Sequence, residues 1–179
     1  MSGFHEQSSG DFTAWSIGQL EAHAATLAPG QMALETIRAL AQSHAYQPSA
    51  DQHMRRRWAK LSLYANARFH GEGPWDRARM FSHNFMLRTW VIEHLGPDNG
   101  DADWDPHAVA ADTLAALTLE PSQARAIAAS WPTLPIEQIG ELRRHKNLTA
   151  HLDWLIGYLR AGPAKDQLIA WREAREHMP

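Results

Sequence analysis

The chain has 179 residues, a formal net charge of −3, 44% hydrophobic residues and eight Trp. This length and apolar content can supply one sizeable core, so we expect a single domain over residues 1–179, with residues 1–12 as a flexible N-terminal segment. The absence of Cys excludes disulfides, a thiol nucleophile and a thiolate zinc site.

The sequence shows no targeting or membrane segment. Its first ten residues lack a basic start followed by an apolar run, and nowhere do about 18 apolar residues follow one another. We therefore expect a cytoplasmic protein with no membrane partner.

Apolar residues recur at helical spacing along almost the whole chain, and the alternating Val, Ile and Thr typical of strands is missing. The sequence therefore predicts an all-α fold, a single compact helical domain of about eight or nine helices with no sheet. In chain order, the expected helices cover residues 14–27, 31–45, 48–69, 74–95, 106–119, a short segment from 121, 136–145, 148–159 and 163–177.

Capping residues and breakers set these boundaries. We expect Thr13 to cap the first helix, Asp105 followed by Pro106 to open the fifth, and Asn147 to cap the eighth. Gly71 and Gly73 should end the third helix. The third helix also carries one apolar stripe, which we expect to face the core: Trp58, Leu61, Ala65 and Phe69.

The middle third of the chain is basic, although the protein as a whole is acidic. Between Met54 and Arg88, eight Arg and Lys residues stand against two carboxylates, so this stretch carries +6 while the whole chain carries −3. Four aromatic residues are interleaved with these charges; Trp58 and Phe69 belong to the core stripe, which leaves Tyr64 and Trp75 as candidate stacking rings. Basic side chains beside exposed rings are typical of nucleic-acid surfaces.

We therefore expect a non-enzymatic protein that binds nucleic acid through a basic face. Successive helical residues lie about 100° apart, so Arg55, Arg56 and Arg57 cannot all point to one ligand. A second basic patch ends the seventh helix, where cations also suit the helix dipole. The candidate binding residues are Arg55, Arg56, Arg57, Lys60, Tyr64, Arg68, Arg77 and Arg79, with Arg143, Arg144 and Lys146 from the second patch.

Three alternatives stay open. In the first, the arginines form ion pairs with the acidic remainder of the chain, including the 98–105 loop. In the second, the protein is an interaction module or homo-oligomer. In the third, it is a helical enzyme or metal protein that uses histidines. By architecture alone, the nucleic-acid hypothesis suits a small subunit of a nucleoprotein assembly or an accessory protein of a mobile element.

Metal and cofactor signals are weak. The Asp-rich segment from Asp101 to Asp112 mimics a calcium loop, but Pro106 stands where the sharp-turn Gly belongs, so we expect a solvated loop whose Asp105 caps the next helix. Among the eleven histidines, His70 and His83 could meet in space, and His145 could share a helix face with Glu141. No phosphate-loop, nucleophile-elbow or dinucleotide motif occurs. We expect no metal and no cofactor.

Overall fold

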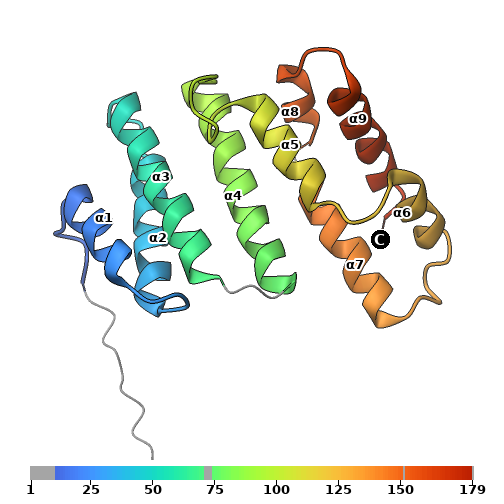
Figure 1. Ribbon diagram of the computed structural model, residues 1–179, viewed down its shortest axis with the longest axis horizontal. Helices are drawn as coiled ribbons and strands as arrows, with labels where there is room; N and C mark the ends of the chain where they lie inside the picture. Colours follow the sequence, from blue (N-terminus) through green and yellow to red (C-terminus); the bar gives the residue numbers. More distant parts are fainter. Residues whose placement is uncertain (1–10, 71–73, 151, 179) are drawn as a thin grey trace, which may run out of the picture. The chain divides into compact units, whose positions relative to one another are not determined.

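The computed structural model describes residues 11–70, 74–150 and 152–178. Within these residues the protein forms nine α-helices and no strand, which confirms the predicted all-α class (Figure 1). The turn that contains Gly71 and Gly73 lies outside the described residues, as does the Trp75 side chain.

The chain divides into two compact units, Met1–Arg77 and Ala78–Pro179, which we call the N-terminal unit and the C-terminal unit. The boundary falls within helix α4 (Pro74–Leu95). A single domain over the whole chain stays a prediction.

The N-terminal unit contains α1 (Ile17–Thr26), α2 (Met32–Ala45) and α3 (Gln52–Phe69). Helices α2 and α3 pack side by side along their length, and α1 packs against both (Figure 1). Their shared core includes Leu20, Leu34, Ile37 and Leu61, all buried. Trp58 and Phe69 pack against this core, so the predicted apolar stripe of the third helix is confirmed.

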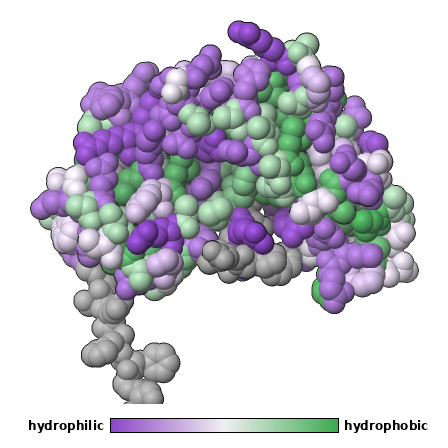
Figure 2. All heavy atoms as spheres, viewed as in Figure 1, coloured by the Kyte–Doolittle hydropathy of each residue, from purple (hydrophilic) through white to green (hydrophobic). Residues whose placement is uncertain are grey.

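The C-terminal unit contains the rest of α4, α5 (Pro106–Ala116), α6 (Pro121–Ala128), α7 (Ile136–Leu148), α8 (Leu152–Tyr158) and α9 (Pro163–Arg175). Helix α9 contacts α5, α6 and α8, and it buries Leu168 and Trp171. The largest hydrophobic patches on the face shown in Figure 2 lie over this unit, whereas hydrophilic residues cover most of the N-terminal unit.

Local signals placed most helix ends correctly. Helix α5 begins with Pro106, and the Asp105 carboxylate accepts a hydrogen bond from the backbone N of His107 at 2.9 Å, as predicted. Proline also occupies the first turn of α6 and α9, where the missing N–H would lack a partner in any case.

Two predicted caps are wrong. Thr13 does not cap α1, because its hydroxyl and backbone N both donate to Asp11 Oδ1, at 2.6 and 3.0 Å. Ser16 caps α1 instead, in a capping box with Gln19. Asn147 lies inside α7, which continues to Leu148, so it does not cap α8.

None of the helices in the described ranges is long and apolar enough to cross a membrane.

Candidate nucleic-acid interface

The exposed side of α3 brings together three of the predicted binding residues. Asp51 Oδ1 accepts from the backbone N of Met54 at 3.0 Å and starts the helix, which sets the register of the residues that follow. Exposed side chains then recur every three or four residues on one side: His53, Arg57, Lys60 and Tyr64. We call these four residues the α3 face.

Glu21 of α1 lies against the edge of the α3 face. The Arg57 guanidinium donates to it through two nitrogens, with Nε 2.9 Å from Glu21 Oε1. This hydrogen-bonded carboxylate raises the pKa of Arg57, so the guanidinium stays charged. The pair ties α1 to α3 and neutralises one of the cations of the α3 face.

Lys60 and Tyr64 line a shallow cavity of about 260 Å³ together with Glu21 and Leu61. Tyr64 is 43% exposed, so its side chain is accessible to a partner from solution. The Lys60 ammonium group and the exposed Tyr64 side chain therefore border the same hollow in the N-terminal unit.

Two other predicted arginines hold the N-terminal unit together. Arg55 Nε donates to the carbonyl of Ala45 at 3.0 Å, and Arg68 Nε donates to the carbonyl of Leu27 at 2.8 Å. These carbonyls belong to the C-terminal ends of α2 and α1, where helices leave acceptors unsatisfied and favour positive charge. Both guanidinium groups therefore stabilise the fold of the N-terminal unit.

The remaining arginines of the middle third lie in different surroundings. Arg56 is half-buried, whereas Arg77 and Arg79 are exposed near the start of α4. The Trp58 ring stacks on His44, with centroids 4.4 Å apart, and is not an open platform.

Arg88 shows that the ion-pair alternative holds for at least one residue of this region. Its guanidinium donates to Asp112 Oδ2 at 2.7 Å and to the loop carbonyls of Ala102 and Asp103, at 2.7 and 3.1 Å. Asp112, the last residue of the calcium-loop mimic, is therefore paired with an arginine. The loop itself folds on its own hydrogen bonds, such as Gly100 N to Asp98 Oδ1 at 3.1 Å.

Two of the three residues in the second predicted patch donate hydrogen bonds within the protein. Arg144 Nη2 donates to Thr118 Oγ1 at 2.9 Å and to Glu141 Oε1 at 3.3 Å. Lys146 Nζ donates to the carbonyl of Met178 at 2.9 Å, which ties α7 to the segment that follows α9. Of the three residues in this patch, Arg143 alone is fully exposed.

The histidine candidates do not form a metal centre in the described part of the chain. Within those residues, no three His, Cys, Asp or Glu side chains form a group that could hold a metal ion. His145 is buried, and both of its ring nitrogens contact backbone groups of α7 and of the α5–α6 connection. Its environment is that of a structural residue.

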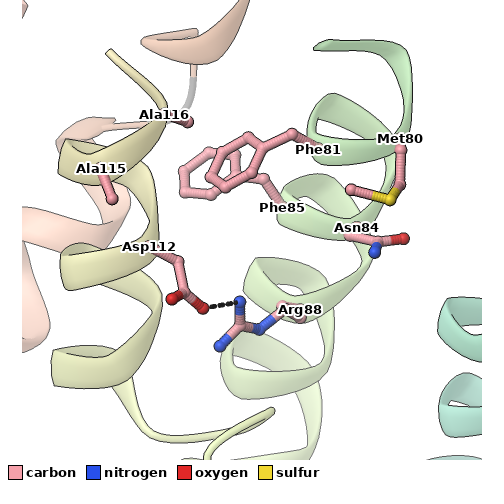
Figure 3. A pocket seen from close by; sticks show the side chains of 8 residues that line it. All are labelled: Met80, Phe81, Asn84, Phe85, Arg88, Asp112, Ala115 and Ala116. Carbon is pink, nitrogen blue, oxygen red and sulfur yellow. Dashed lines mark hydrogen bonds and ion pairs between the residues drawn. The ribbon is translucent and has the colours of Figure 1, made fainter. Parts of the chain in front are cut away.

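A pocket lies between α4 and α5 in the C-terminal unit, and sequence reasoning did not predict it (Figure 3). This pocket has a volume of about 380 Å³ and is lined by Phe81, Phe85 and Arg88 from α4 and by Asp112, Ala115 and Ala116 from α5. Two small alanines facing two phenylalanines of another helix have no local sequence signature, because the pairing exists only after the helices pack.

Comparison with known proteins adds no relative: no protein family, curated protein or solved structure matches this chain.

Proposed function

We propose that the protein is a non-enzymatic binding protein for single-stranded nucleic acid and that the α3 face is its contact surface. The observation that carries this proposal is the position of Lys60 and Tyr64, which are both exposed and border one cavity, with Arg57 one turn away. Cations beside an open ring match the two things that every single strand offers, its phosphates and its base faces.

The choice of a single strand follows from the ring. A tyrosine can stack only on a base that is not already stacked inside a duplex, and such stacking contributes about 1–3 kcal/mol per base. The α3 face contains no array of cations comparable with a duplex-binding surface, since Arg55 and Arg68 are engaged with helix ends. Binding should therefore be weak and dependent on both the charge and the ring.

Salt dependence follows from the number of phosphates that the α3 face neutralises. Each phosphate contact on a single strand contributes about 0.7 to the slope of log K against log salt. Arg57 is paired with Glu21, so Lys60 is the residue that we expect to neutralise a phosphate, and the expected slope is about −0.7.

The test is fluorescence anisotropy of a labelled dT 12-mer against the full chain at several salt concentrations. Lys60→Glu should weaken binding and flatten the salt slope, and Tyr64→Ala should weaken it by about 5- to 100-fold while the slope stays the same. Matched controls are Arg160→Glu, an exposed cation of the C-terminal unit, and Tyr158→Ala, whose ring is 41% exposed against 43% for Tyr64.

Binding that is absent in the wild type, or that the control variants reduce as much as the test variants, would overturn the proposal. A duplex of the same length bound more tightly than the single strand would overturn the role of the ring.

A second proposal is a protein interface or homo-oligomer contact in the C-terminal unit. Two large apolar side chains are exposed around the α6–α7 connection, Trp131 at 37% and Ile136 at 73%. Tryptophan is enriched among residues that dominate binding energies, and exposed apolar patches mark contact surfaces. Sedimentation velocity tests it: self-association that Ile136→Glu abolishes supports this proposal, and a concentration-independent monomer contradicts the homo-oligomer.

A further inference from the structure

The pocket between α4 and α5 has the dimensions and chemistry of a small-molecule site. Its volume of about 380 Å³ falls in the range of ligand pockets, roughly 300–1,000 Å³. The residues that line it belong to the C-terminal unit, so the pocket is separate from the α3 face.

One side of the pocket is aromatic and shaped for a flat group. The Phe81 and Phe85 rings are nearly parallel, with an interplanar angle of 13° and centroids 6.2 Å apart. Phe85 is buried and Phe81 is half-buried, so the two rings line the pocket at different depths. The methyl groups of Ala115 and Ala116 lie on the opposite helix (Figure 3), and their small size leaves the space open.

The other side of the pocket is polar but carries no net charge. Arg88 is 9% exposed and is held from behind by the Ala102 and Asp103 carbonyls. Its Nη1 donates to Asp112 Oδ2, so the two opposite charges cancel at the pocket wall.

Asp112 retains capacity to accept a hydrogen bond. A carboxylate has about four lone-pair positions on its two oxygens, and Arg88 occupies a position on Oδ2. The Asp112 side chain is 57% exposed, so Oδ1 is accessible to a donor that enters the pocket.

We infer that this pocket binds a small, uncharged aromatic molecule with one N–H or O–H donor, of the size of an indole or a phenol. The ring packs against Phe81 and the alanine methyl groups, and the donor reaches Asp112 Oδ1. Because the charges of Arg88 and Asp112 cancel, the wall offers no net attraction to a charged ligand, which fits an uncharged molecule with a hydrogen-bond donor.

The ligand side of the inference is tested with indole and 1-methylindole, which differ in the N–H donor. Ligand-observed NMR titrations of the full chain should show saturable binding of indole, with 1-methylindole bound about tenfold more weakly, the effect of one hydrogen bond of about 1.4 kcal/mol. Absence of saturable indole binding, or equal affinity for the two compounds, overturns the inference.

The protein side is tested with a pair of matched variants on α5. Ala115→Trp fills the pocket, whereas Ala111→Trp places the same side chain one turn earlier at a position that does not line it. Both alanines are exposed, so neither change should unfold the protein. Indole binding should be at least tenfold weaker in Ala115→Trp and unchanged in Ala111→Trp. Equal binding by the two variants would place indole elsewhere and overturn the inference; Ala115→Leu repeats the test with a smaller side chain.

Discussion

The buried His145 ring accepts a hydrogen bond at Nε2 from the backbone N of Thr118, 3.0 Å away, while its Nδ1 lies 2.8 Å from the Glu141 carbonyl. A carbonyl can only accept and an amide N–H can only donate, so the network requires the neutral tautomer with the proton on Nδ1. The backbone N of Leu119 also donates to Nε2, at 3.2 Å. One neutral imidazole thus joins the α5–α6 connection to α7.

This arrangement predicts a loss of stability in acid. Burial lowers the pKa of His145 below its ordinary value, and the nearby Arg144 charge lowers it further against the raising effect of the Glu141 carbonyl. The unfolded chain therefore binds a proton at a higher pH than the folded chain does. The stabilisation is complete above the unfolded pKa of about 6.5 and is lost as the pH falls toward the lower folded value, by at most about 1.4 kcal/mol per pH unit.

Urea unfolding at pH 7.5 and pH 5.5 measures this effect. The wild type should lose stability over this interval, and His145→Gln should be less stable at pH 7.5 but show a smaller change with pH. His94→Gln, a substitution of an exposed histidine, should keep the wild-type dependence. A wild-type slope in His145→Gln would mean that other groups cause the acid sensitivity.

Arg68 should be a stability residue of the N-terminal unit. Replacing it by Met keeps the aliphatic stem but leaves the Leu27 carbonyl without its charged donor, which should lower the free energy of unfolding by about 1–3 kcal/mol. Arg77→Met, at an exposed position of the same unit, should change it by less than about 0.5 kcal/mol. Equal urea midpoints for the two variants would contradict the capping role.

The two partners of the Arg88–Asp112 pair should contribute unequally. Arg88→Met removes donors from the Ala102 and Asp103 carbonyls as well as from Asp112, and it should destabilise the protein by about 2–3 kcal/mol. Asp112→Asn changes an exposed partner and should cost less than about 1 kcal/mol. Thermal unfolding of both variants checks the order, and a larger loss in Asp112→Asn would mean that the loop does not depend on Arg88.

The sequence predicted features that depend on neighbours in the chain. The Asp105–Pro106 start of α5 and the core stripe of α3 are set by residues within one or two turns, so their patterns are visible without a structure. The geometric argument that Arg55, Arg56 and Arg57 diverge rests on helix periodicity and agrees with the structure, in which Arg57 is exposed and the other two are half-buried.

The sequence could not predict partners that only packing creates. Arg68 and the Leu27 carbonyl are 41 residues apart, and nothing near Arg68 indicates that it caps another helix. Residue type alone favours Thr13 as a cap, whereas the reciprocal hydrogen bonds of Ser16 and Gln19 set the start of α1. The pocket between α4 and α5 was missed for the same reason, since its walls come from two helices.

Two glycines should respond in opposite directions to alanine. Gly96 follows the last residue of α4 with φ of +84°, a left-handed conformation that a side chain disfavours by about 1–2 kcal/mol. Gly157 lies within α8 with no neighbouring atom within 4 Å of an added Cβ. There an alanine should stabilise the helix by about 0.5–1 kcal/mol, since glycine loses more backbone freedom on folding.

Both glycines belong to the C-terminal unit, so the same urea transition reports on both substitutions. Gly96→Ala should lower the midpoint and Gly157→Ala should raise it. Steric contact does not explain why the two alanines act in opposite directions, because an added Cβ at Gly96 also meets no atom within 4 Å. If Gly96→Ala left the midpoint unchanged, the left-handed residue would not be required at the end of α4; a lower midpoint isolates backbone conformation as the reason for glycine at this position.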